Sequence, residues 1–159
     1  MHFRNLFFAF LIVFFFPNLS PAGDKKDMGG WEIDGEYNKH YDVAEWDEFK
    51  ATVISVKEVV PLPGMSPGVA LLVRDSEDEK ILIHICPAWY AKPQRIGVRS
   101  GERIRVKGVW AEINGKELFM ASKVKKGLDF EFKVRLTKDG TPFWTMPPEE
   151  VERELRKKN

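Results

Sequence analysis

Hydrophobic and polar positions alternate along most of the chain after residue 45, and β-branched and aromatic residues occupy many of the hydrophobic positions. This period of two is typical of strands that bury one face and expose the other. In the fourth such stretch, Ile104 and Val106 take one face, whereas Arg103, Arg105 and Lys107 take the opposite face. The pattern predicts six strands, at residues 46–60, 69–75, 80–86, 102–110, 116–126 and 128–136.

The breaks between these stretches indicate how the predicted strands are connected. Residues 61–68 hold three prolines and two glycines and can only form a loop. Asn114-Gly115 is typical of a type I′ hairpin turn, and residues 88–101 fit a short helix or turn that plugs one end. Three strands, a helical interruption and a hairpin follow the order of the OB-fold, a partly open five-stranded barrel; a two-sheet sandwich is the alternative. We therefore predict an all-β OB-fold barrel with an extra carboxyl-terminal strand and short helices.

The two ends of the chain differ in composition from the predicted barrel. Arg4 precedes an apolar run at residues 6–16, and small residues follow Pro17, as in a secretory signal peptide cleaved after Ala22. The run is shorter than the roughly 20 residues of a membrane helix. We therefore expect a periplasmic or secreted protein with no stable membrane span after cleavage, and an uncleaved anchor is the alternative. The predicted parts are a signal peptide at residues 1–22, a polar lead-in at 23–45, an OB-fold domain at 46–146 and a charged helix at 147–159.

Acidic and basic residues are distributed unevenly along the chain. Residues 23–79 carry 14 acidic and 6 basic residues, whereas residues 80–159 carry 10 acidic and 18 basic residues. Alternation in the fourth and fifth strands, which the hairpin makes neighbours, favours an outward-facing basic patch. Water and salt, the acidic segment at residues 24–48, or an acidic partner or anionic surface could neutralise this patch. Its predicted members are Arg103, Arg105, Lys107, Lys123 and Lys125.

The stretch IHICPAWY, residues 83–90, holds the only cysteine, Cys86, two residues after His84. Together with His40 and a carboxylate these side chains could form a metal site, which needs three or four ligands. The alternative is a half-exposed histidine beside a small buried thiol. No signature of an activated nucleophile, phosphate loop or dinucleotide motif is present. The sequence therefore favours a protein that is not an enzyme and that needs no cofactor.

Several motifs resemble those of a family of small exported bacterial OB-fold proteins. HICPAWY and the closing RLTKDGTPFW are similar to that family's Gly-Pro-Ala-Trp-Tyr and to its arginine followed by Gly-x-Pro-x-Trp. The resemblance implies a poorly characterised periplasmic binding or accessory role. Cys86 stands where the family has glycine, so no shared metal site is implied. MPPEEVEREL is similar to a segment of the haem chaperone of cytochrome c maturation, but KDGTPFWTM lacks the required His or Cys, so haem attachment is not implied.

Ligands of OB-folds usually bind on the face of the second and third strands. Aromatic side chains beside basic ones can stack bases or sugars, although Trp89 and Tyr90 can equally cap the barrel as core. We expect a non-enzymatic exported OB-fold module that binds a small ligand or an envelope partner protein. A metal- or haem-handling accessory factor and an oligonucleotide- or oligosaccharide-binding protein are the alternatives, with nucleic acid disfavoured by export. The expected ligand-binding residues are Arg74, Leu82, His84, Trp89 and Tyr90.

Overall fold

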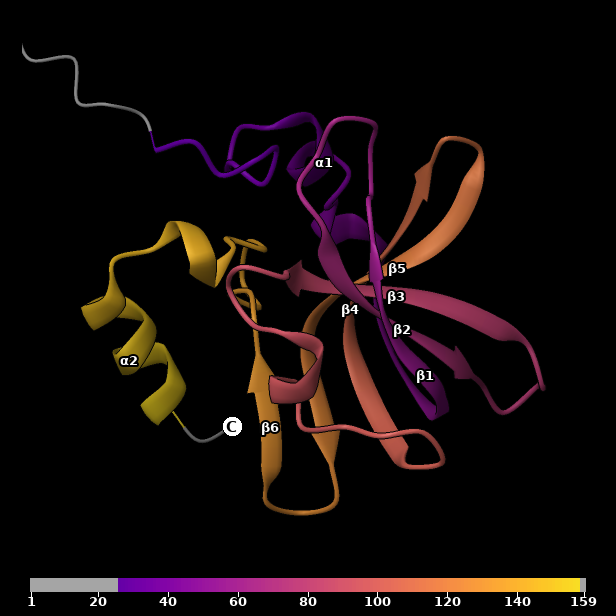
Figure 1. Ribbon diagram of the computed structural model, residues 1–159. Helices are drawn as coiled ribbons and strands as arrows, with labels where there is room; N and C mark the ends of the chain where they lie inside the picture. The colour runs from indigo at the N-terminus through magenta and orange to yellow at the C-terminus, as the bar shows by residue number, and fades with distance from the viewer. Residues whose placement is uncertain (1–25, 158–159) are drawn as a thin grey trace, which may run out of the picture.

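The computed structural model describes residues 26–157, and the predicted signal peptide at residues 1–22 lies outside them. The described chain is mostly β, with short helices around one six-stranded sheet (Figure 1). The strands are β1 (Trp46–Val59), β2 (Gly68–Arg74), β3 (Lys80–Pro87), β4 (Arg103–Ile113), β5 (Lys116–Lys126) and β6 (Phe130–Lys133). The helices are α1 (Glu36–Lys39) and α2 (Pro148–Arg156), with 3-10 helices η1 (Val43–Glu45), η2 (Pro93–Arg95) and η3 (Phe143–Thr145).

The first five strands close into a ring because the long β1 pairs with two neighbours. Its first half lies antiparallel to β4 and its second half antiparallel to β2, with Thr52 paired to both. The ring closes where β3 runs parallel to β5, at the pairs Ile83–Phe119 and His84–Met120. β6 extends the sheet beyond β5. This is the five-stranded OB-fold barrel with an extra carboxyl-terminal strand that the sequence predicts.

β4 and the hairpin that follows it match the sequence pattern. Ile104 and Val106 are buried in the barrel, whereas Arg103 is exposed on the outside. Asn114 and Gly115 have φ angles of 53° and 72°. A type I′ turn requires positive φ at both central residues, so the hairpin prediction is confirmed.

β3 departs from the predicted alternation. Cys86 pairs with Val69 but His84 pairs with Ala70, so the register shifts at Ile85. An extra residue of this kind is a β-bulge, which re-aims the side chains around it. His84 is only 4% exposed, so the prediction of a half-exposed histidine is wrong, whereas the alternative of a buried thiol at Cys86 is confirmed.

Two other segments were predicted less closely than β4. The extra strand expected at residues 128–136 is limited to β6, and a turn at residues 127–129 precedes it. The connection at residues 88–101 contains a turn and the short 3-10 helix η2, which begins at Pro93, in agreement with the predicted short helix or turn. The remainder of this connection consists of turns and irregular backbone.

The lead-in packs against the upper end of the barrel in Figure 1, where α1 lies beside the β1–β2 loop. Trp31 and Tyr37 are each only 1% exposed. Trp31 Nε1 donates a hydrogen bond to the carbonyl of Ser66 at 3.0 Å, and Ser66 N donates to the carbonyl of Gly29 at 2.8 Å. A Cβ at Gly68 would lie 2.5 Å from the Trp31 ring, so glycine at this position allows the indole to reach the strand.

The carboxyl-terminal segment joins the same assembly. Trp144 Nε1 donates to the carbonyl of Trp31 at 2.9 Å. Lys133 Nζ donates to the carbonyls of Lys157 at 2.8 Å and Glu154 at 3.4 Å, at the end of α2. These carbonyls have no partner within the helix, so Lys133 caps α2 and holds it beside β6. Among residues 26–157, no helix combines the length and the apolar composition needed to cross a membrane.

Candidate functional site

A basic face is formed by outward side chains of β1, β2, β4 and β5 that lie opposite one another in the strand register. Neighbouring strands are about 4.8 Å apart, and side chains on one face of a strand are about 7 Å apart. Like charges that lie directly opposite one another destabilise a sheet unless something neutralises them. The three rows of the basic face are Arg74–Thr52–Arg103, Lys50–Arg105–Lys125 and Glu48–Lys107–Lys123.

Glu48 neutralises part of the basic face from β1. Its carboxylate lies 3.1 Å from Arg105 Nη1 and 3.1 Å from Lys107 Nζ. Desolvation alone would raise the pKa of Glu48, but hydrogen bonds and charge attraction from these two bases hold it below its usual value. Glu48 is the last residue of the acidic segment, residues 24–48, which was one of the alternatives for neutralising the patch.

Glu131, on β6, neutralises the far margin of the same face. Its carboxylate lies 3.0 Å from Lys133, 3.1 Å from Lys125 and 3.5 Å from Lys123. Lys123 is only 2% exposed, so its prediction as an exposed patch residue is corrected: it is buried on β5 beside β6, with Lys133 as its cross-strand neighbour. Burial lowers the pKa of the Lys123 ammonium, and Glu131 opposes this effect.

The first two rows of the basic face form the floor of an open cleft of about 700 Å³. The turn after β2 contributes Asp75 and Ser76 to its wall, and the β5–β6 turn contributes Gly127 and Leu128. Among the described residues that line the cleft, the only carboxylate is Asp75. The basic side chains that line it are Lys50, Arg74, Arg103, Arg105 and Lys125.

The cations of the cleft differ in how well they are neutralised. Arg105 and Lys125 have the carboxylate partners described above, and Arg74 pairs with Asp78 at 2.8 Å on the exposed turn. Lys50 and Arg103 make no ion pair with any residue in the described part of the chain. The centre of the cleft therefore carries positive charge that the fold itself does not neutralise.

The face expected to bind ligands, on β2 and β3, is covered by the chain itself. Tyr37 packs over His84 with ring centroids 5.8 Å apart, and its hydroxyl lies 3.2 Å from His84 Nδ1 in a hydrogen bond. Burial lowers the pKa of His84 to about 4. This histidine is therefore neutral near pH 7 and inaccessible to a ligand.

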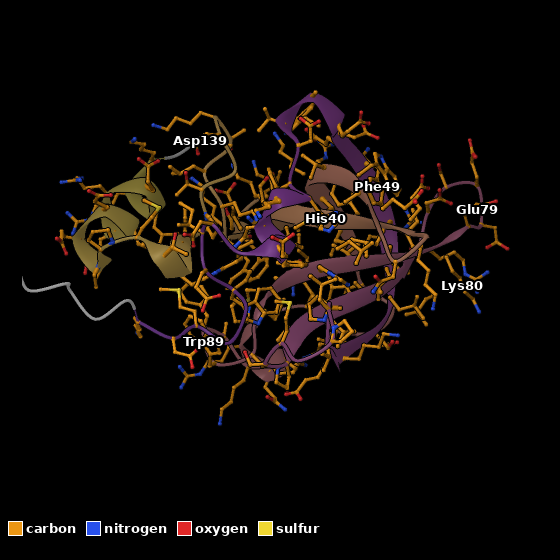
Figure 2. The ribbon with its side chains drawn as sticks, turned by 90° about the horizontal axis from the view of Figure 1, so that it is seen from above. His40, Phe49, Glu79, Lys80, Trp89 and Asp139 are labelled. Carbon is orange, nitrogen blue, oxygen red and sulfur yellow. The ribbon has the colours of Figure 1, made fainter. Side chains whose placement is uncertain are left out.

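The other expected ligand-binding residues are not brought together. Leu82 is partly buried against the core, and Tyr90 tilts against Trp144 with centroids 6.1 Å apart. Trp89 is exposed, with Lys26 5.9 Å from its ring. Figure 2 shows Trp89 and Lys80, the cross-strand neighbour of Arg74, on opposite sides of the molecule. Of that set, only Arg74 lines the basic cleft.

The predicted metal site is not formed in the described residues. Within residues 26–157 no three His, Cys, Asp or Glu side chains are grouped so that they could hold a metal ion. His84 faces Tyr37, whereas His40 lies at the end of α1 (Figure 2). Burial raises the pKa of Cys86 to about 12, so the thiol does not ionise readily as a ligand or nucleophile.

A second notable cluster holds a buried arginine, and we call Trp31, Tyr37, Tyr41, Arg135 and Trp144 the aromatic clamp. The Arg135 guanidinium lies 4.6 Å from the Tyr41 ring centroid and 4.9 Å from that of Trp144. It donates to the Asn38 side-chain oxygen at 2.8 Å and to the carbonyl of Gly140 at 3.1 Å. The clamp joins the lead-in to the carboxyl-terminal segment, and the Arg135 guanidinium has an oxygen acceptor from each of them.

Comparison with known proteins assigns the chain to a family. A sequence profile of the MamS/MamX magnetosome protein family matches residues 45–130, just over half of the chain. The chain belongs to this family. The assignment indicates a magnetosome-associated protein and agrees with the expectation of a small, poorly characterised family, whereas the individual motif comparisons stay predictions. The matched region contains all five strands of the ring and every residue that lines the cleft.

No curated protein matches this MamS/MamX family member. Among solved structures, a chain of a replication protein A heterotrimer bound to ssDNA is similar, with 14% sequence identity and a TM-score of 0.40. The match covers 54% of this chain and 59% of that one, which is less than two thirds of the length of the other protein.

Sequence reasoning missed two important residues in this family member: Lys50 of the basic face, and Glu131, which neutralises the margin of that face. Lys50 was read only as part of a long first strand, although its period-two spacing from Glu48 places both on the outward face. Glu131 was not linked to the patch because the pairing of β6 with β5 was unknown. Charge alternation in the first strand could have placed Lys50 on the outward face, but its position beside Arg105 and the link from Glu131 to Lys125 depend on the strand pairing.

Proposed function

We propose that this protein is a non-enzymatic, exported OB-fold module of the magnetosome that binds an anionic ligand or partner on its basic face. The observation that carries this proposal is the cleft of about 700 Å³, lined by five basic side chains and one carboxylate. Ligand pockets commonly have volumes of roughly 300–1,000 Å³, so the cleft is large enough for a specific ligand. Family membership supports the association with the magnetosome.

The titratable groups with strongly shifted pKa values lie outside the cleft, and this separation supports binding rather than catalysis. Burial strongly shifts the pKa values of Tyr37, His84 and Cys86, and none of these three residues lines the cleft. A general acid or base must come within hydrogen-bonding reach of its substrate. The cleft instead offers permanent positive charge, which attracts and holds an anion.

The amino-terminal sequence supports export to the periplasm or beyond. A basic residue, a short apolar run and small residues before Gly23 follow the order of a secretory signal peptide. The intact mass of protein recovered from the host envelope tests this part of the proposal. A mass that lacks residues 1–22 would support export with cleavage, and a mass that retains them would support an anchored form instead.

Binding of a polyanion to charge-reversal variants tests the proposed surface. A double variant, Lys50→Glu with Arg103→Glu, reverses the two cations that lack carboxylate partners. A control, Arg95→Glu with Lys116→Glu, makes the same change in net charge at exposed positions outside the cleft. The probes are fluorescent poly-glutamate and heparin, titrated at several salt concentrations.

We expect the cleft variant to lose at least about tenfold in affinity for one or both probes, because each charged contact contributes roughly 1.5 kcal/mol or more. The affinity of the control variant should fall by less than about twofold, because salt screens charges that are distant from the bound probe. Equal losses in the two variants would mean that only overall charge matters, and the proposed surface would be wrong.

A further inference from the structure

We propose that the basic cleft recognises a linear oligophosphate, with a terminal phosphate between Arg74 and Arg103 and further phosphates over the Lys50–Arg105–Lys125 row. This inference rests on the proposed function, because it specifies the chemistry of the anion that the basic face binds. Hydrogen bonding, strand spacing and the lining of the cleft each support it.

The polar side chains in the cleft are almost all hydrogen-bond donors. Guanidinium and ammonium groups donate only, and Thr52 and Ser76 add hydroxyl groups. The one carboxylate, Asp75, has its Oδ1 occupied by the backbone N–H groups of Glu77 and Glu79, each at 2.9 Å. The backbone of the floor strands is engaged in the sheet ladders. A ligand that mainly accepts hydrogen bonds matches such a site.

This donor excess favours phosphate over an acidic peptide. A peptide would bring carboxylates but also backbone N–H groups, which need acceptors that the cleft lacks. Linked phosphates present oxygens on every side and, when ionised, no donors. Arginine binds phosphate through two parallel hydrogen bonds, and three of the five basic residues in the cleft are arginines.

Strand geometry indicates a ligand longer than a single phosphate. Arg74 and Arg103 flank Thr52 from the two strands on either side of it, each about 4.8 Å away across the sheet. One phosphate above the Thr52 hydroxyl can therefore meet both guanidinium groups. The second row lies about 7 Å further along the strands. A ligand that reaches the extended side chains of both rows therefore needs several linked phosphates.

The lining of the cleft also distinguishes an oligophosphate from a nucleic acid. Proteins that bind single-stranded nucleic acid stack bases on aromatic side chains. None of the described residues that line the cleft is aromatic, and its one exposed apolar side chain is Leu128, because Ala51 and Ile104 are buried in the barrel core. The site therefore offers contacts for phosphates but no stacking platform for bases.

Calorimetric titration of the full chain with orthophosphate, pyrophosphate and tripolyphosphate at constant ionic strength tests this inference. Affinity should rise with the number of phosphates and be highest for tripolyphosphate. Arg103→Gln should weaken tripolyphosphate binding by about tenfold, as expected for loss of a charged bidentate contact. Arg103→Lys, which retains the charge but not the bidentate geometry, should weaken it by a smaller factor, whereas Arg95→Gln should leave it unchanged.

Three other probes separate the inference from the proposed function on which it rests. Hexaglutamate, oligothymidylate and phosphatidylglycerol vesicles represent an acidic peptide, a nucleic acid and a phosphate-bearing membrane. One of these probes could bind more tightly than tripolyphosphate and lose affinity in the variant with Lys50→Glu and Arg103→Glu. That result would overturn the oligophosphate inference but support an anion-binding face. Equal losses for Arg103→Gln and Arg95→Gln would also overturn it, and no cleft-dependent binding of any anion would overturn both proposals.

Discussion

The aromatic clamp and the basic cleft both hold arginine side chains, but they treat the positive charge in opposite ways. In the clamp, Arg135 is 3% exposed and lies between two aromatic rings, with oxygen acceptors for its N–H groups. In the cleft, Arg103 is exposed and lacks an ion pair with any described residue. The clamp includes the segment that covers the usual OB-fold ligand face, whereas the cleft remains open between two turns.

This difference indicates which region stabilises the fold and which is available for binding. A buried cation is tolerated only when its surroundings satisfy it, so the clamp is complete without a ligand. Clustered cations on an exposed face repel one another and are not required by the barrel. Substitutions in the clamp should therefore reduce stability, whereas substitutions in the cleft should reduce binding and leave stability unchanged or slightly improved.

The largest expected effect is at the clamp. Trp31→Ala removes an indole that contacts Tyr37 and Trp144 edge-to-face, with ring centroids 4.7 Å and 5.7 Å apart. We expect the free energy of unfolding to fall by about 3–5 kcal/mol, the usual cost of truncating a buried tryptophan. Urea unfolding followed by circular dichroism measures this change.

Trp89→Ala provides the matched control, because Trp89 is 45% exposed and outside the clamp. It should change the free energy of unfolding by less than about 1 kcal/mol. Folded Trp31→Ala protein should also bind anions in the cleft as the parent chain does. Loss of anion binding in the folded variant, or a stability change as small as that of Trp89→Ala, would contradict the separation of the two regions.

The barrel was predictable from sequence because its determinants are local. Alternation marks β4, and the Asn114-Gly115 turn fixes its pairing with β5. The cover over β3 was not predictable in the same way. Tyr37 and His84, the residue that it covers, are 47 positions apart in sequence. The lead-in that carries Tyr37 has little periodicity by which its docking could be recognised.

The candidate site was predicted only in part, because some of its residues follow from local alternation and others depend on strand pairing. Arg103 and Arg105 follow from alternation within one strand, and they line the cleft as outward-facing residues. The addition of Lys50 and Arg74 depends on β1 pairing with both β4 and β2, which only the closed barrel establishes. The misplacement of His84 on an exposed ligand face arose because strand alternation does not reveal what packs on the outer side of a strand.

A smaller effect is expected from the pH dependence of stability at His84, which packs against Tyr37 of the clamp. The pKa of His84 is lowered from 6.5 to about 4 by burial. Between these values the unfolded state binds more protons than the folded state, so stability falls as pH falls. Lowering the pH from 6.5 to 4.5 should reduce the free energy of unfolding by about 2–3 kcal/mol, which urea unfolding at each pH measures.

His84→Gln should remove most of this pH dependence, whereas His40→Gln, at a less buried histidine, should retain it. The carboxylates of Glu48 and Glu131 have lowered pKa values, so their contribution to stability is lost below this window. If the free energy of unfolding of His84→Gln fell with pH as steeply as that of the parent chain, other groups would control acid stability. His84 would then not be held in its neutral form beneath Tyr37.

The smallest expected effect is a gain in stability at the cleft. Arg103→Gln removes a cation whose neighbours on the basic face include Arg74 and Arg105. At low salt we expect the free energy of unfolding to rise by about 0.5 kcal/mol, because like charges on neighbouring strands repel. In about 1 M salt, where the screening length falls to about 3 Å, the gain should disappear. Arg95→Gln, outside the cleft, should show neither the gain nor its salt dependence. A loss of stability in Arg103→Gln would mean that the fold already satisfies this cation, and the cleft would then resemble the clamp instead of differing from it.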